Sequence, residues 1–191
     1  ACDPRLNARQ SLDLAFEIIT SQTNQPPPPT NNIGQKWLQI PDTTPNGIDV
    51  QIHDWSMLAD LWAAQGRVDE AIEVRTHAVQ RMERTYGPDH SDVAGALNGL
   101  ARLYLRRANL VAAETLLVRS VAIREKAHGP NNLLTARDLA TLGEISLKRR
   151  NYGLAEERLV QAVARLEAAG LASEEEIAEA RRNLAVTYRA L

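Results

Sequence analysis

The sequence predicts an all-α fold, a solenoid of stacked helical hairpins, and three observations lead to this prediction. A leucine followed by a small residue recurs every 42 residues, at Leu58-Ala59, Leu100-Ala101, Leu142-Gly143 and Leu184-Ala185. Between these points, apolar residues follow the three-to-four-residue period of an amphipathic helix. Gly87-Pro88 and Gly129-Pro130, also 42 residues apart, mark helix ends. A unit of this length cannot bury its apolar face alone, so neighbouring units have to stack.

Further columns of the repeat support the same register. Small residues recur in the intervening helices at Ala71, Ala113 and Ala155. Trp62, Tyr104 and Tyr188 share a second column, which Ser146 interrupts. Small residues let two antiparallel helices approach closely, while leucines and aromatic residues fill the space between adjacent hairpins.

The apolar period and the boundary residues together predict the helices. They are expected over residues 55–65, 68–85, 92–107, 110–127, 134–149, 152–168 and 174–190. Asp54 and Ser91 are predicted N-caps, and Ser173 with Glu176 has the spacing of a capping box. The predicted repeats span about 52–91, 94–133 and 136–172, and the helix at 174–190 closes the array.

The first 51 residues do not follow the repeat and form a separate arm. Residues 5–21 predict one amphipathic helix, with Leu12, Ala15, Phe16 and Ile19 on its apolar side. A stiff proline-rich spacer follows at 25–30. Residues 37–40 and 48–52 alternate apolar and polar residues, which predicts a small hairpin or two extended strands that wrap the repeats.

The role of the helix at residues 5–21 stays open among three alternatives. It caps the array, docks on a partner, or lies at a membrane surface. Repeat arrays need their ends covered, and the polar side of this helix lacks the basic residues expected at anionic lipid, so capping is favoured.

Composition excludes several classes of function. Hydrophobic residues make up 44% and charged residues 24% of the sequence, as in ordinary globular proteins. The net charge of −2 gives no basic field for nucleic acid, and aromatic residues at 4% give few stacking platforms for single strands. No run of residues is long and apolar enough to be a membrane span.

The sequence predicts no enzyme. The histidines are His53, His77, His90 and His128, and none belongs to a metal-binding, nucleotide-binding or nucleophile motif. No cofactor and no metal are expected. An alternative is a small-ligand or enzymatic pocket between the arm and the repeats, lined by Trp37, Trp55 and Trp62, although these tryptophans fit a core better.

Two segments carry a resemblance to a known family. Residues 87–94 (GPDHSDVA) and 96–104 (ALNGLARLY) resemble the 42-residue tetratricopeptide repeat found in kinesin light chain and many bacterial proteins. Residues 122–126 (AIREK) resemble the end of that repeat's second helix. The resemblance covers about residues 52–191 and implies a right-handed superhelix of about three and a half repeats that binds another protein on its concave face. The third repeat departs from the pattern at Ser146 and at Gly170, which comes one residue early.

In this repeat the first helix of each hairpin lines the groove, so the register predicts the binding residues. They are Asn98, Arg102, Leu105, Arg106, Arg137, Leu147, Lys148, Arg182 and Arg189. Asn98 matches the asparagine with which the family bonds the backbone of an extended peptide. The excess of cationic over acidic residues on this face predicts an acidic segment or a C-terminal carboxylate as ligand. The full lysine and asparagine clamp of chaperone-binding relatives is not present.

The expected function is a non-catalytic scaffold or adaptor that binds a protein segment in the groove and also uses the arm. An alternative rests on Cys2, the single cysteine. Ala1-Cys2 followed by polar residues is typical of a processed bacterial lipoprotein, whereas an arbitrary start with an incidental cysteine explains it equally well. This alternative predicts a lipid-anchored subunit of a bacterial envelope complex in the periplasm, and a cytoplasmic location is the other possibility.

Overall fold

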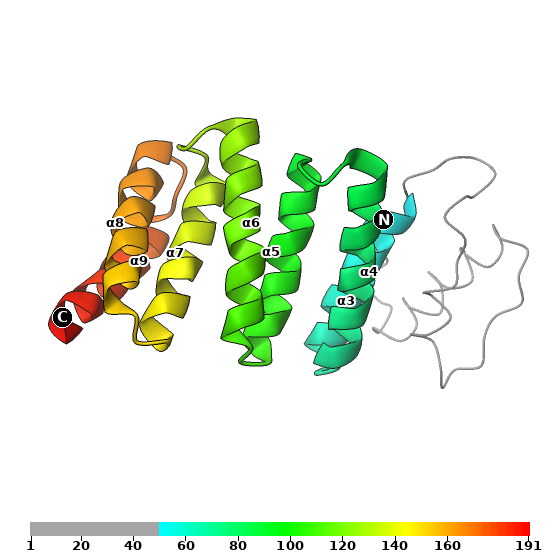
Figure 1. The fold of residues 1–191 in the computed structure, drawn as a ribbon, viewed down its shortest axis with the longest axis horizontal. Helices are drawn as coiled ribbons and strands as arrows, with labels where there is room; N and C mark the ends of the chain where they lie inside the picture. Colours follow the sequence, from blue (N-terminus) through cyan, green and yellow to red (C-terminus); the bar gives the residue numbers. More distant parts are fainter. Residues whose placement is uncertain (1–49) are drawn as a thin grey trace, which may run out of the picture. The chain divides into compact units, whose positions relative to one another are not determined.

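The computed structural model describes residues 50–191, without the side chains of residues 50–54 and 58. Every element in this range is an α-helix: α3 (Val50–Ala64), α4 (Val68–Tyr86), α5 (Ser91–Arg106), α6 (Leu110–His128), α7 (Leu133–Lys148), α8 (Tyr152–Ala169) and α9 (Glu174–Ala190) (Figure 1). The predicted all-α class is therefore confirmed. The chain divides into two compact units, Ala1–Ala78 and Val79–Leu191, and α4 runs through the division.

The start of α3 differs from the prediction, whereas every other helix boundary agrees within one residue. Because α3 begins at Val50, the extended strand predicted for residues 48–52 is wrong from Val50 onward, and Asp54 lies inside the helix instead of capping it. A five-residue alternation is too short to distinguish a strand from the start of a helix. The predicted helix at 5–21, the proline-rich spacer and the extended segment at 37–40 lie outside the described residues.

Two tryptophans lie in the core of the described part of the first unit. Trp55 and Trp62 on α3 are buried, at 2% and 1% exposure. The ring of Trp55 lies 4.7 Å from the ring of His77 on α4, and the guanidinium of Arg67 lies 4.6 Å from the centre of the Trp62 ring. These tryptophans are therefore core residues, as their sequence context favours.

Close helix approach organises the second unit. Hairpins α5–α6 and α7–α8 are antiparallel pairs, followed by α9 (Figure 1). Ala113 and Ala155 are fully buried, as the repeat columns predict. At Gly143, an added Cβ would lie 2.5 Å from Leu159 Cγ, so α7 and α8 touch at a point where a larger side chain has no room. The small residues of the repeat therefore perform the packing role predicted for them.

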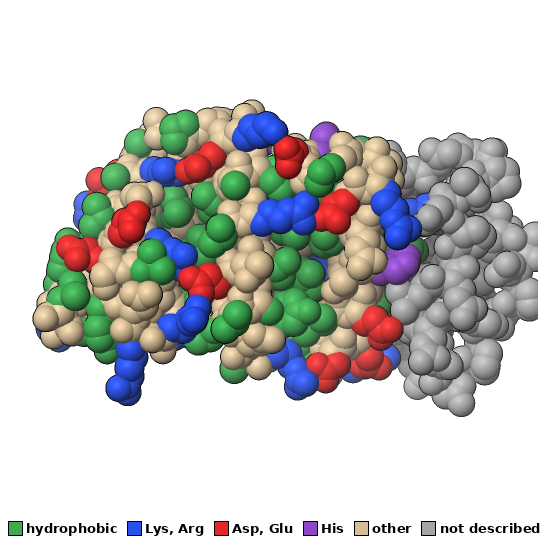
Figure 2. Space-filling model, viewed as in Figure 1, with side chains coloured by type: hydrophobic (Ala, Val, Ile, Leu, Met, Phe, Trp, Pro, Cys, Tyr) green, Lys and Arg blue, Asp and Glu red, His purple; other side chains and the backbone are tan. Residues whose placement is uncertain are grey.

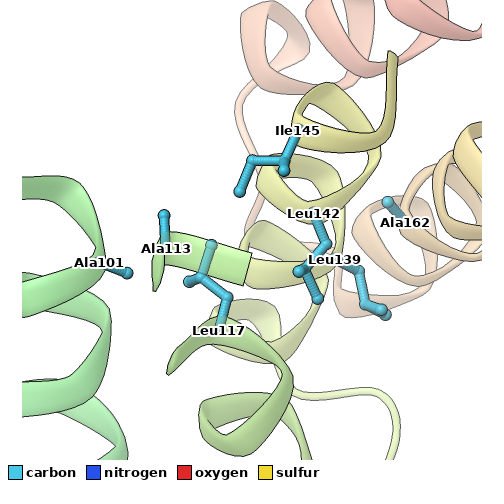
Figure 3. Packing of buried hydrophobic residues seen from close by; sticks show 7 residues of the cluster. All are labelled: Ala101, Ala113, Leu117, Leu139, Leu142, Ile145 and Ala162. Carbon is cyan, nitrogen blue, oxygen red and sulfur yellow. The ribbon is translucent and has the colours of Figure 1, made fainter. Parts of the chain in front are cut away.

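A hydrophobic cluster of the second unit takes residues from four consecutive helices, as Figure 3 shows. Its buried members are Ala101, Ala113, Leu117, Leu139, Leu142, Ile145 and Ala162. They come from α5, α6, α7 and α8, so α7 closes the interior of the preceding hairpin while it packs on its own partner. This sharing is the reason that neighbouring repeats stack and stabilise each other.

Of the remaining predicted caps, the capping box is confirmed and Ser91 is wrong. Ser173 and Glu176 form both bonds of the predicted capping box. At α5 the N-cap is His90, whose Nδ1 accepts from the backbone N–H of Asp92 at 3.3 Å, so the prediction of Ser91 is wrong. An imidazole nitrogen accepts this bond as a carboxylate oxygen would, and it lies one residue closer to the Gly87-Pro88 turn.

Candidate functional site: the first-helix face

The residues predicted to bind a ligand lie on the first helix of each hairpin in the second unit. We call them together the first-helix face: Asn98, Arg102, Leu105 and Arg106 on α5, Arg137, Leu147 and Lys148 on α7, and Arg182 and Arg189 on α9.

Side-chain bonds show that the three first helices are neighbours. Between α5 and α7, Asn98 Nδ2 donates to Asp138 Oδ1 at 2.6 Å. Between α7 and α9, Asn183 Nδ2 donates to Glu144 Oε1 at 3.2 Å, and Arg137 Nε lies 2.7 Å from a Glu176 carboxylate oxygen. The first helices that carry the predicted residues therefore follow one another in the order α5, α7 and α9.

The cations of this face fall into two groups. Arg102, Arg106, Arg182 and Arg189 are exposed and form no ion pair with any described residue. Arg137 is paired with Glu176, and Lys148 lies 3.9 Å from Glu144 in an exposed pair. The leucines Leu105 and Leu147 are half-buried beside them. The face thus combines unneutralised guanidinium groups with limited apolar area.

Elsewhere in the second unit most arginines are paired with a carboxylate. Glu114 on α6 accepts from Arg158 at 2.7 Å and also pairs with Arg149, while Arg165 pairs with Glu125 at 2.5 Å. In Figure 2, basic and acidic side chains are interspersed over the face in view. The unpaired arginines of the first-helix face are therefore distinct from the ion pairs that join the second helices.

A buried polar network that the repeat pattern did not predict lies beneath this face. Asp138 is fully buried and accepts hydrogen bonds from Asn98 Nδ2, from Ser120 Oγ at 2.7 Å and from an Arg124 guanidinium nitrogen at 2.5 Å. Burial raises the pKa of the Asp138 carboxyl, and the bonds from Ser120 and Asn98 and the charge of Arg124 oppose that rise. The same Arg124 nitrogen also donates to Leu134 O at 3.1 Å.

One signal in the sequence marks this network. The residues 42 positions after Ser120, Arg124 and Asp138 are Ala162, Leu166 and Ala180, which are small or apolar. The second and third repeats therefore place polar residues at three positions where the next repeat has small or apolar residues. Because Asp138 holds the amide nitrogen of Asn98, the network also sets the orientation of a predicted ligand-binding side chain.

The part of the chain that the structure describes contains no group of three or more His, Cys, Asp or Glu residues placed to hold a metal ion. Two of its histidines have structural roles: His77 packs on Trp55, and His90 caps α5. Among the helices α3 to α9, none has the length and apolar character needed to cross a membrane. Cys2 and Trp37 lie outside the described residues.

Comparison with known proteins agrees with the helical-hairpin repeats. The family model for the tetratricopeptide repeat matches residues 55–126 and 92–168, which together cover more than half of the chain. The chain therefore belongs to the tetratricopeptide repeat family. Proteins with this fold generally mediate protein–protein interaction and are typically non-enzymatic scaffolds. No curated protein matches the sequence of this chain significantly.

Solved structures of kinesin-light-chain-like proteins share the fold. One is BtubC (BKLC) from P. vanneervenii, with 18% identity and a TM-score of 0.76, where the match covers 96% of this chain and 66% of that one. A second is a putative kinesin light chain of Podosopora anserina with nearly identical TPR-like repeats, with 20% identity and a TM-score of 0.67, covering 96% of this chain and 78% of that one. The resemblance to the kinesin-light-chain variety of the repeat is thus confirmed.

Proposed function

We propose that this protein is a non-catalytic scaffold whose first-helix face binds an extended acidic segment, or a C-terminal carboxylate, of another protein. One observation carries the proposal. Arg102, Arg106, Arg182 and Arg189 project from the first helices without an acidic partner among the described residues, although most other arginines of the second unit have one. A carboxylate-bearing ligand supplies the missing partners.

The chemistry of the face suits this class of ligand. A guanidinium presents a planar fork of N–H donors that binds a carboxylate through two parallel bonds. Arg102 and Arg106 stand one helical turn apart on α5, so that they reach successive carboxylates or one carboxylate together. With its Nδ2 held by Asp138, Asn98 directs its Oδ1 to accept from a ligand backbone N–H, while Leu105 and Leu147 supply apolar contact.

A binding measurement with designed peptides tests the proposal. The probe is a fluorescently labelled peptide that alternates Glu and Leu, and a Lys-Leu peptide of equal length is the comparison. We expect binding of the acidic peptide only, with affinity that falls as salt is raised. The double variant Arg102→Glu/Arg106→Glu should weaken binding tenfold or more, a loss of about 1.4 kcal/mol.

The matched control changes the same total charge away from the face. Lys126→Glu/Arg84→Glu also reverses two exposed cations, and these lie on the second helices α6 and α4. This control should bind like the wild type. Equal weakening by both double variants would show that net charge, and not this face, attracts the peptide. Unchanged binding by Arg102→Glu/Arg106→Glu would refute the proposal.

The location of the protein is a separate proposal that rests on the Ala1-Cys2 pair. We propose attachment to a bacterial envelope membrane through a lipid on Cys2, where the scaffold would serve as a subunit of a membrane complex. Mass spectrometry of protein purified from its native cell tests this directly. A thioether-linked diacylglycerol on Cys2 is expected, and an unmodified thiol would refute the anchor without affecting the binding face.

A further inference from the structure

Glu144 on α7 is an acidic residue among the residues of the first-helix face, most of which are cationic. It stands four residues before Lys148 and seven after Arg137, so helical spacing places it on the same side of α7. Its side chain is 34% exposed. The residue 42 positions earlier, on α5, is Arg102. Equivalent positions of two successive first helices therefore carry opposite charges.

The contacts of Glu144 within the chain do not account for its charge. Asn183 Nδ2 donates to Glu144 Oε1 at 3.2 Å, a bond that joins α7 to α9. An uncharged amide oxygen would accept this bond equally well. Lys148 Nζ lies 3.9 Å from Glu144 Oε2, which is beyond hydrogen-bond distance, and an exposed pair of this kind contributes little. The Glu144 carboxylate is thus held in place while it keeps acceptor capacity for a ligand.

Arginines without an ion pair to any described residue lie on the two first helices beside Glu144. Arg102 is on α5, which the bond between Asn98 and Asp138 joins to α7. Arg182 is on α9, directly before the asparagine that bonds to Glu144. The axes of packed helices lie about 10 Å apart and an extended segment advances about 3.3 Å per residue, so neighbouring first helices are about three ligand residues apart. A segment that crosses α5, α7 and α9 in turn therefore meets a cation, an anion and a cation at this interval.

We propose that Glu144 is a specificity-determining residue, which selects a ligand segment with a basic residue between two acidic residues, each about three positions away. The acidic residues bind Arg102 and Arg182, and the basic residue binds the Glu144 carboxylate. An acidic residue at the central position would face that carboxylate, and like charges brought together across an interface suppress binding of the wrong partner. The charge pattern of the ligand is thereby added to the proposed function, on which this selection rests.

Two fluorescently labelled peptides that differ only in their central residue test the proposal. They are Glu-Leu-Ser-Lys-Leu-Ser-Glu and Glu-Leu-Ser-Glu-Leu-Ser-Glu, and fluorescence anisotropy measures the affinity of each for the full chain. The wild type should bind the Lys-centred peptide more tightly, by about fivefold or more, although that peptide carries less negative charge. Glu144→Gln removes the charge and keeps an amide oxygen for the bond from Asn183, so in this variant the preference should vanish or reverse.

The matched control is Glu125→Gln, which removes the same charge from the second helix α6, where the Glu125 side chain is 38% exposed and pairs with Arg165. This variant should keep the preference of the wild type. A wild type without a preference for the Lys-centred peptide, a preference that Glu144→Gln retains, or one that Glu125→Gln also loses would overturn the proposal and leave the proposed function standing. So would a wild type that binds only the alternating Glu and Leu peptide. A wild type that binds none of the three acidic peptides would refute the proposed function as well.

Discussion

The buried network around Asp138 makes a quantitative prediction about single and combined substitutions. Asp138→Ala removes the carboxylate and leaves Arg124 with 8% side-chain exposure and only the Leu134 carbonyl as a partner. Ser120 keeps a bond to the Ala94 carbonyl, and half-buried Asn98 can turn to water, so the loss falls mainly on Arg124. Breaking one side of a buried ion pair costs about 3–5 kcal/mol. That is a large share of the stability of a domain, which is about 5–15 kcal/mol.

The next repeat interface indicates how the loss can be reversed. It holds Ala162, Leu166 and Ala180 in the equivalent columns, and Leu166 and Ala180 are packed there in a hydrophobic cluster. The triple variant Ser120→Ala/Arg124→Leu/Asp138→Ala places the same three residue types at the interface around residue 138. Replacement of a whole buried ion pair by apolar residues is often neutral or stabilising by about 1–4 kcal/mol. We expect the triple variant to be at least as stable as the wild type.

Urea unfolding followed by circular dichroism measures the free energy of unfolding for the wild type and both variants. We expect the single variant to be strongly destabilised and the triple variant to recover its stability, which corresponds to a coupling free energy of a few kcal/mol among residues in contact. A single variant that loses less than about 1 kcal/mol would show that Arg124 finds water or another partner. A triple variant as unstable as the single one would show that this interface requires the polar network.

Three further predictions concern local geometry and charge. Ala108 has a positive φ of 56°, which costs a non-glycine residue about 1 kcal/mol, so Ala108→Gly should raise the free energy of urea unfolding by about that amount. Gly143→Leu forces a side chain into Leu159 and should lower the free energy of unfolding by about 1–3 kcal/mol or more. The bond from Arg137, together with the Ser173 backbone N–H, holds the pKa of the Glu176 carboxyl below its ordinary value of 4.5. The ionised Glu176 carboxylate therefore stabilises the folded protein fully at a pH above 4.5, and this contribution is lost as the pH falls through the lower pKa of the folded state. Between about pH 5 and pH 3, the free energy of unfolding should fall further for the wild type than for Glu176→Gln.

Control variants test whether each of these changes in stability is specific to its site. Gly66 occupies the same column as Ala108 with a φ of 82°, so Gly66→Ala should destabilise where Ala108→Gly stabilises. Gly153 is exposed with open space around it, and Gly153→Leu should be tolerated where Gly143→Leu is not. A stabilising Gly66→Ala, a tolerated Gly143→Leu, or parallel pH profiles for the wild type and Glu176→Gln would each contradict the corresponding prediction.

Periodic features of the chain were predictable because equivalent residues make the same contacts in each repeat. The 42-residue columns of leucine and small residues predicted the helix boundaries to within a residue beyond α3, and they predicted the burial of Ala113 and Ala155. The capping box at Ser173 and Glu176 was predictable because it is a local bond between residues three apart. The start of α3 was not, because a short alternating segment is compatible with either a strand or a helix.

Part of the candidate site was likewise predictable from the sequence, and part was not. Register alone placed Arg102, Arg106 and Arg182 on exposed first-helix positions, since helical spacing decides which residues share a side. Which of the cations are already neutralised was decided only in the tertiary structure, because Arg137 meets Glu176 from another helix.

A helical repeat, its hairpin boundaries and the small residues at which its helices meet could be predicted from the sequence, because these depend on spacing along one chain. The hydrogen bonds that Asp138 accepts from Asn98, Ser120 and Arg124, on two other helices, could be found only in the folded structure. They depend on distances between residues far apart in the chain. Those distances are set by how the hairpins stack.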